Sequence, residues 1–242
     1  MTKAVVLLSG GLDSTTCLAM AVNKHSAANV AALTVFYGQR HAKELEAARN
    51  VVDFYKVKHY ELDAAEVFRH SNSALLETSN ETLEQSSYAE QMKKNHSPKV
   101  ATYVPFRNGL MLSMAASFAD GLYDDDLVEL YIGVHDDDAA GSAYADCRAD
   151  FVAAMSAAIR IGTYEKIHIV APFLCQKKSD VVKVGLSIGA PHHLTWSCYE
   201  RGEVPCGHCA TCIDRAQAFA VNGVKDPALV DLRRKKFLSL VE

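Results

Sequence analysis

Apolar residues follow two patterns along this chain. Short, nearly continuous apolar runs predict buried strands, and they lie at 4–8, 30–36, 57–62, 127–134 and 166–170. Longer segments with apolar residues three or four positions apart predict helices, and they lie at about 15–23, 43–55, 109–119, 146–161 and 179–188. Strands that alternate with helices predict an α/β fold, with an open, mostly parallel, twisted sheet and helices on both faces.

Ligands of such a sheet bind beyond the carboxyl ends of its strands. The loop that contains Arg40 and His41 follows the second predicted strand and is expected at this edge. Residues 71–99 are rich in Ser, Asn, Gln, Glu and Lys, which is typical of a long binding loop or lid. Because no linker or internal repeat divides the chain, we expect a single domain over 1–242 that contains a lid-like insertion at 70–100.

The composition allows a sizeable core and narrows the choice of partners. Of the 242 residues, 49% are hydrophobic and 22% are charged, and the formal net charge is −4. This balance argues against electrostatic binding of nucleic acid or of an anionic membrane by the chain as a whole. The basic run at 233–236 is expected to be a solvated tail. No apolar stretch reaches membrane-spanning length, so we expect a cytoplasmic protein without a membrane or nucleic-acid partner.

A glycine turn joins the first predicted strand to the first predicted helix, with the sequence Ser-Gly-Gly-Leu-Asp-Ser at 9–14. Glycines allow a close backbone approach to a ligand, and the free N–H groups at a helix start attract anions. A phosphate chain is the expected ligand. The alternative is a purely structural role, in which the same residues form a tight turn that Ser9 or Asp13 caps. No lysine follows the glycines, which excludes the common NTPase loop. The candidate binding residues are Leu8, Ser9, Gly10, Gly11, Leu12, Asp13, Ser14, Thr15 and Thr16.

Four of the seven cysteines cluster near the C-terminal end as C-x7-C-x2-C-x2-C, at Cys198, Cys206, Cys209 and Cys212. Four thiolates at this spacing can close a tetrahedral shell around a metal, and zinc or an iron–sulfur cluster suits such a shell. A closed shell has no open position, which indicates a structural metal rather than a catalytic one. The alternative is a set of free thiols. His208 is a spare imidazole in this segment, and Cys17, Cys147 and Cys175 are expected to be packing residues.

The glycine turn resembles the pyrophosphate-binding loop of the N-type ATP pyrophosphatases, which use ATP to make adenylates. Further motifs are Tyr-Gly-Gln-Arg-His at 37–41, Tyr-Val-Pro-Phe-Arg-Asn at 103–108, Asp-Cys-Arg at 146–148 and Thr-Trp-Ser-Cys-Tyr at 195–199. Together with the cysteine cluster, they resemble the 7-cyano-7-deazaguanine synthase family of queuosine biosynthesis over essentially the whole chain. The resemblance implies a ligase that converts 7-carboxy-7-deazaguanine and ammonia to the nitrile with ATP, Mg²⁺ and one structural Zn²⁺ per chain.

The resemblance also implies roles for individual residues of the site. Asp13 is expected to help hold magnesium, and Arg107 to contact the substrate carboxylate or the α-phosphate, although a surface ion pair would also explain Arg107. The acidic run at 136–138 would hold magnesium or the guanine-like edge, unless it is only an Asp-rich turn. Lys177 and Lys178 would offset phosphate charge if they are not solvated. Trp196 and Phe106 are candidates for ring stacking, with core packing as the alternative.

Two other functions share parts of this pattern. An ATP pyrophosphatase that modifies or thiolates tRNA would use the same loop, and its cysteines would hold an iron–sulfur cluster. A zinc-ribbon nucleic-acid module would need a basic face, but residues 198–215 contain as basic residues only Arg201 and Arg215. A homodimer is the expected assembly, because it is the commonest state of such enzymes.

Overall fold

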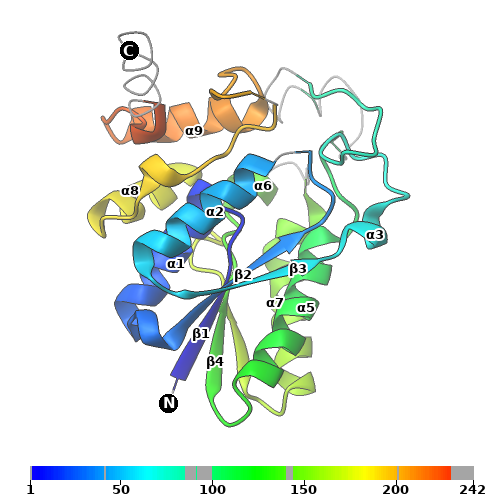
Figure 1. The fold of residues 1–242 in the computed structure, drawn as a ribbon, viewed down its shortest axis with the longest axis vertical. Coiled ribbons are helices and arrows are strands. Elements are labelled where there is room, and N and C mark those ends of the chain that lie inside the picture. Colours follow the sequence, from blue (N-terminus) through cyan, green and yellow to red (C-terminus); the bar gives the residue numbers. More distant parts are fainter. Residues whose placement is uncertain are drawn as a thin grey trace.

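The computed structural model describes residues 2–40, 42–84, 91, 100–139, 144–200 and 202–229. Within these ranges five strands form one sheet in the order β3-β2-β1-β4-β5, and each neighbouring pair is parallel (Figure 1). Their bounds are β1 Thr2–Leu7, β2 Val30–Phe36, β3 Lys58–Asp63, β4 Leu127–Tyr131 and β5 Ile167–Val170. The predicted parallel α/β sheet is confirmed.

Helices connect the strands and cover the sheet. Their bounds are α1 Leu12–His25, α2 Ala42–Tyr55, α3 Ala65–Phe68, α5 Arg107–Leu122, α6 Asp136–Ala139, α7 Ala149–Gly162, α8 Lys178–Ser187 and α9 Ala210–Val221. The predicted starts of α1 and α5 were two or three residues late, because the first turns of these helices carry polar side chains that apolar periodicity does not detect. The prediction of helix from residue 146 was wrong, since a separate turn at Ala145–Cys147 precedes α7.

Alternate residues of the buried strands supply two hydrophobic layers. Val5 and Leu7 of β1 face α5 and α7, where Leu112 and Ile159 are buried in the same cluster. The intervening residues of β1 pack instead against α1, α2, α8 and α9, in a second cluster that contains Leu18, Val51, Val181 and Phe219. Figure 1 shows these two groups of helices on opposite sides of the sheet, as expected for strands that are buried on both faces.

The order of the strands reverses beside β1, because β2 lies on one side of it and β4 on the other. Loops that leave neighbouring strands in opposite directions open a crevice at this point. The predicted strand at 127–134 ends at Tyr131, so its last three residues belong to the crevice instead. Gly133 lies there against α1, and a Cβ atom on it would be 3.0 Å from the backbone nitrogen of Ser14.

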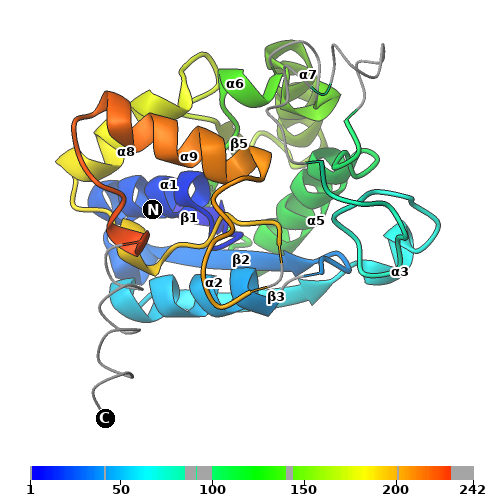
Figure 2. The ribbon, with the colours of Figure 1, turned by 90° about the horizontal axis from the view of Figure 1, so that it is seen from above.

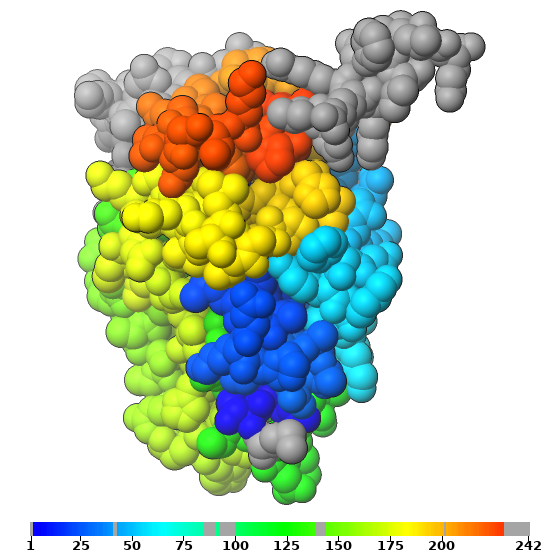
Figure 3. Space-filling model, turned by 90° about the vertical axis from the view of Figure 1, so that its left-hand side faces the viewer, coloured from blue at the N-terminus to red at the C-terminus, as the bar shows by residue number. Residues whose placement is uncertain are grey.

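The C-terminal helices extend the layer that contains α1. Figure 3 shows α8 and the loop after it, in yellow, between the blue N-terminal part and the orange-red α9. Seen from above, α9 runs across this end of the molecule and the segment before α9 passes beside α2 (Figure 2). Arg215 of α9 is buried and its guanidinium donates to Asp226, Thr195, Ser197 and the carbonyl of His192. These bonds fasten the 192–197 loop to α9.

The insertion at 70–100 is described only in part. Arg40 donates to the carbonyls of Leu76, Ser79 and Glu81, so this side chain holds the start of the insertion. His41, residues 85–90 and 92–99, and the basic run at 233–236 lie outside the described residues. Among the helices that are described, none has the length and apolar character needed to cross a membrane.

Candidate active site

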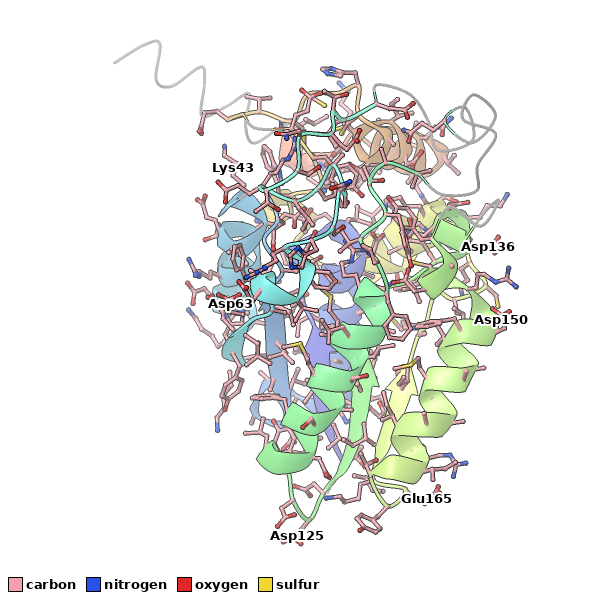
Figure 4. The ribbon with its side chains drawn as sticks, turned by 90° about the vertical axis from the view of Figure 1, so that its right-hand side faces the viewer. Lys43, Asp63, Asp125, Asp136, Asp150 and Glu165 are labelled. Atoms are coloured by element: carbon pink, nitrogen blue, oxygen red, sulfur yellow. The ribbon has the colours of Figure 1, made fainter. Side chains whose placement is uncertain are left out.

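A cavity with a volume of about 210 Å³ opens at the crevice between β1 and β4. The glycine turn, the loop after β4, the start of α5 and the 196–199 segment all contribute to its lining. The side-chain view places Lys43 and Asp136 toward this end of the molecule, whereas Asp125 and Glu165, which precede β4 and β5, lie at the opposite end (Figure 4).

The glycine turn is shaped by its own hydroxyl groups and by α2. Gly10 has a φ of +81°, and a Cβ atom there would be 2.3 Å from the carbonyl oxygen of Glu44. The backbone N–H of Gly11 donates to Ser9 Oγ at 3.2 Å, and the N–H of Ser9 donates to Ser14 Oγ at 3.2 Å. Only glycine combines this positive φ with such close packing, so the turn is held in one conformation.

The predicted binding residues of this turn divide into three groups. Leu8, Ser9, Gly11, Asp13 and Ser14 line the cavity. Thr15 and Thr16 are fully buried and do not line it. Thr16 Oγ1 donates to the carbonyl of Leu12 at 2.9 Å and therefore accepts from His192 Nε2 at 3.0 Å. Gly10 and Leu12 support the turn by packing.

A charged cluster lies beside the turn. Lys178 Nζ donates to Asp13 Oδ2 at 2.9 Å, and His135 Nε2 is 3.2 Å from the same nitrogen and 3.3 Å from Asp138 Oδ2. Burial would raise the pKa of the Asp13 carboxyl, but Lys178 and His135 outweigh burial and lower that pKa below its ordinary value. Burial would likewise lower the pKa of Lys178, but the carboxylates of Asp13 and Asp138 raise it. Asp13 is therefore ionised and Lys178 cationic.

This cluster fits a divalent cation. Asp13 Oδ1 is buried and has no hydrogen-bond partner among the described residues, although its carboxylate is ionised. Magnesium prefers oxygen ligands and takes one or two carboxylates together with phosphates and waters. Asp13 and Asp138, which both line the cavity, are the residues that would hold it.

Arg107 lies on another wall of the cavity, at the first position of α5. Its Nη1 donates to the Tyr37 hydroxyl at 3.4 Å, and its guanidinium carbon is 5.3 Å from the centre of the Tyr37 ring. Asp146 Oδ2 accepts the backbone N–H of Asn108 at 2.9 Å and so caps the start of α5. Phe106, just before Arg107, has a φ of +52°. These contacts aim the Arg107 side chain at the cavity.

Glu44 lines the same wall and was missed in the sequence analysis. Burial raises the pKa of its carboxyl to about 7, although the Arg107 guanidinium opposes this shift. The position of Glu44 in the first turn of a helix that follows a strand could have indicated it, because helix starts lie at the ligand edge. A carboxyl that titrates near neutral pH in a cavity is typical of a functional site.

The three residues of the acidic run at 136–138 lie in different surroundings. Asp136 is exposed, and Figure 4 labels it at the right-hand edge of the molecule. Asp137 Oδ2 accepts the backbone N–H of Lys178 at 2.8 Å and so caps α8. Asp138 lines the cavity beside His135. Lys177, in contrast to Lys178, is exposed.

The two aromatic candidates also differ. Trp196 is 8% exposed and lines the cavity, with Lys43 Nζ 4.9 Å from the centre of its ring. Phe106 is 54% exposed and its ring packs edge-on against Phe151 rather than in the cavity lining. Trp196 is thus the one of these two aromatics that can face a ring-shaped ligand.

The four clustered cysteines come together in space. Their sulfur atoms all lie within 4.8 Å of one another, and Cys206 Sγ is 3.9 Å from Cys212 Sγ. A zinc ion with bonds of about 2.3 Å to four sulfurs needs sulfur pairs about 3.8 Å apart, so the residues fit this metal. Cys198 Sγ accepts the N–H groups of Glu200 and Cys206, each at 3.3 Å, which favours a thiolate.

The other sulfur and imidazole candidates lie outside this shell. His208 is exposed, and its Nε2 is 2.9 Å from Glu200 Oε1. Cys17 and Cys147 are buried, as expected, and Asn108 Nδ2 donates to Cys147 Sγ at 3.2 Å in the cavity wall. The expectation that Cys175 is a packing residue was wrong, because it is exposed in the loop before α8.

Comparisons with known proteins confirm the resemblance. A family model described as "Queuosine biosynthesis protein QueC" matches residues 3–223. The 7-cyano-7-deazaguanine synthase of Archaeoglobus fulgidus is 39% identical over 241 residues, which is 99% of this chain and 95% of that protein. The enzyme of the same name from Caldicellulosiruptor saccharolyticus is 40% identical over 225 residues, 93% of this chain and 94% of that protein. Among solved structures, NMN synthetase from Francisella tularensis is 13% identical, with a TM-score of 0.44, over 92% of this chain and 78% of that one. The chain belongs to the QueC family of queuosine biosynthesis proteins.

Proposed function

We propose that this chain is a 7-cyano-7-deazaguanine synthase, which makes 7-cyano-7-deazaguanine from 7-carboxy-7-deazaguanine and ammonia with ATP. Its relatives carry that name over nearly their whole length. The observation that carries the proposal is one cavity lined by both an anion-binding glycine turn and Arg107, which suits an acid substrate. The chain would work as a single ATP-pyrophosphatase-type domain, as a cytoplasmic homodimer.

The chemistry needs two activations in one cavity. A carboxylate oxygen of the substrate bonds to the α-phosphorus of ATP while the bond to pyrophosphate breaks. Ammonia then attacks the acyl carbon, and AMP leaves as the nitrogen loses a proton, which gives an amide. The amide oxygen displaces pyrophosphate from a second ATP, and loss of AMP and the remaining nitrogen protons forms the nitrile. These steps need positioning and charge stabilisation rather than a protein nucleophile.

The cavity residues suit these steps. The backbone N–H groups of the glycine turn, with the hydroxyls of Ser9 and Ser14, would bind the pyrophosphate end of ATP. Magnesium held by Asp13 and Asp138 would neutralise phosphate charge. Lys178 is held by Asp13 within hydrogen-bonding range and would contribute a second positive charge there. Arg107 would hold the substrate carboxylate or the α-phosphate with its planar fork.

Zinc in the four-cysteine site would be structural. All four positions of a tetrahedral shell are filled by sulfur, so no position remains for a substrate. The chemistry would therefore take place at the glycine turn and not at this metal.

Mass spectrometry of the protein incubated with ATP, ammonium and 7-carboxy-7-deazaguanine tests the proposal. We expect AMP, pyrophosphate and a product with the mass of the nitrile. A parallel incubation with unmodified tRNA and ATP covers the alternative. Modified tRNA together with an unchanged deazaguanine would replace the proposed function by direct tRNA modification. Metal analysis should find one zinc per chain, and sedimentation should find the mass of a dimer.

A further inference from the structure

The proposed reaction brings two purine-like rings into one cavity, the adenine of ATP and the deazaguanine of the acid. The edges of these rings differ in their hydrogen-bonding groups. A guanine-like ring presents two adjacent N–H donors, at N1 and the 2-amino group, beside the carbonyl oxygen at C6. Adenine presents an acceptor at N1 beside its amino donor. An ionised carboxylate accepts both donors of the first edge and repels the N1 lone pair of the second.

Glu44 presents a carboxylate from a fixed backbone. The backbone carbonyl oxygen of Glu44 packs closely on the glycine turn, since a Cβ atom at Gly10 would be only 2.3 Å from it. The Glu44 side chain is half-buried and lines the cavity. Within the described part of the chain, no hydrogen bond occupies its carboxylate, so both oxygens are available to a ligand.

The other acidic side chains of the cavity are already engaged. Asp13 accepts from Lys178 at 2.9 Å, and Asp138 Oδ2 lies 3.3 Å from His135 Nε2. Both belong to the end of the cavity that fits phosphate and magnesium. Glu44 is therefore the cavity carboxylate left for a neutral ring with N–H donors.

The neighbours of Glu44 match the rest of the same ring. Glu44, Arg107 and Tyr37 all line the cavity, and Arg107 Nη1 donates to the Tyr37 hydroxyl at 3.4 Å. In 7-carboxy-7-deazaguanine the C6 oxygen and the 7-carboxylate project from the edge next to the N–H donors. The arginine guanidinium can donate to the C6 oxygen and the 7-carboxylate, while the neighbouring carboxylate accepts from the two N–H donors.

We propose that Glu44 is the specificity residue that accepts the N1 and 2-amino hydrogens of the guanine-like edge, an inference that rests on the proposed function. Arg107 would donate to the adjacent acceptors. Glu44 would thereby select the deazaguanine ring over adenine at this wall. Its high pKa is consistent with a carboxyl that is desolvated before the ligand arrives and is stabilised as a carboxylate by two N–H donors.

A substrate pair tests this role. The wild type and Glu44→Gln are assayed with 7-carboxy-7-deazaguanine and with the analogue that lacks the 2-amino group. We expect the wild type to prefer the amino substrate by roughly 10- to 100-fold in kcat/KM, because a hydrogen bond to a charged group is lost with the analogue. Glu44→Gln should raise KM for the amino substrate by at least ~10-fold and remove most of the preference, while KM for ATP stays unchanged.

Glu46→Gln is the matched control, because Glu46 is exposed on the same helix, and it should behave as the wild type. Wild-type preference retained in Glu44→Gln would overturn the inference. A fall in kcat with KM and preference unchanged would also overturn it, since Glu44 would then act as a proton acceptor. If Glu44→Gln does not fold, Glu44→Asp keeps both oxygens on a shorter arm and must still weaken the preference. Failure of the wild type to convert either compound would instead count against the proposed function.

Discussion

The backbone N–H of Trp196 donates a hydrogen bond of 3.0 Å to the carbonyl of Gly10. The indole N–H of Trp196 donates in turn to the carbonyl of Cys198 at 2.9 Å. Thr211, between two cysteines of the cluster, donates to the carbonyl of Ser197 at 2.6 Å. The four-cysteine segment and the glycine turn are thus joined by consecutive hydrogen bonds. A metal at the cysteines would stabilise the glycine turn without touching the proposed reacting atoms.

Loss of the metal site should therefore affect both stability and nucleotide binding. We expect Cys209→Ser to lose zinc, to melt at a lower temperature and to bind ATP more weakly, because a structural metal couples its binding to folding. Elemental analysis and thermal melting measure the first two effects, and ATP titration the third. Cys175→Ser is the control, since Cys175 is exposed and outside the cluster. Unchanged zinc content in Cys209→Ser would show that Cys209 is not a ligand.

Because Gly10 packs closely on α2, we expect a side chain at this position to reduce stability. Gly10→Ala forces a side chain into a positive φ and against the Glu44 carbonyl. A positive φ alone costs an alanine roughly 1–2 kcal/mol. We expect Gly10→Ala to lose more stability than this, and also to lose ATP turnover. Gly189→Ala provides the comparison, because Gly189 has a φ of +69° and open space around it. Equal effects of the two substitutions would mean that the contact with α2 is unimportant.

The ion pair between Asp13 and Lys178 is expected to link ATP turnover to stability. Asp13→Ala should abolish ATP consumption and destabilise the fold by roughly 3–5 kcal/mol, because the buried Lys178 ammonium loses its partner. The double variant Asp13→Asn/Lys178→Met should recover much of the stability but none of the activity. Urea unfolding and an assay of AMP release separate the two effects. Wild-type turnover in Asp13→Ala would remove this carboxylate from the mechanism.

His192 should make the protein sensitive to mild acid. Burial and the nearby Arg215 lower the pKa of His192 to about 4, below the unfolded value of about 6.5. Between these values the unfolded state binds more protons, so stability falls as the pH drops from 6.5 to 4, by up to ~3 kcal/mol. In His192→Gln this part of the pH dependence should disappear from urea titrations. In His193→Gln it should persist, because His193 is exposed.

Glu44 should change stability with pH in the opposite direction, over an overlapping pH range. Its folded pKa of about 7 lies above the ordinary value of 4.5 for a glutamate, so the folded state binds more protons between these values. The contribution of Glu44 to stability therefore falls as the pH rises from 4.5 to 7 and is constant above 7. Glu44→Gln should become more stable than the wild type over that range, as followed by urea unfolding from pH 5 to 8. A stability difference independent of pH would contradict the raised pKa.

The sequence by itself determined the features that are local in the chain. Strand and helix periodicity predicted the parallel sheet, because each element is identified by residues a few positions apart. The glycine turn at 9–14 and the four cysteines within fifteen residues are contiguous motifs, whose spacing limits what they can bind. Arg107 was also found, since its motif is continuous.

Only the tertiary structure decided how distant residues combine around these motifs. Lys178 is 165 positions from Asp13, yet the two share an ion pair, and Thr16 turns from the cavity to His192 across 176 positions. Glu44 is recognised as a cavity carboxylate only once α2 packs on Gly10 and Arg107 lies nearby. Burial and the charges around a group set its pKa and its available bonds, and both depend on which strands and helices the fold brings together.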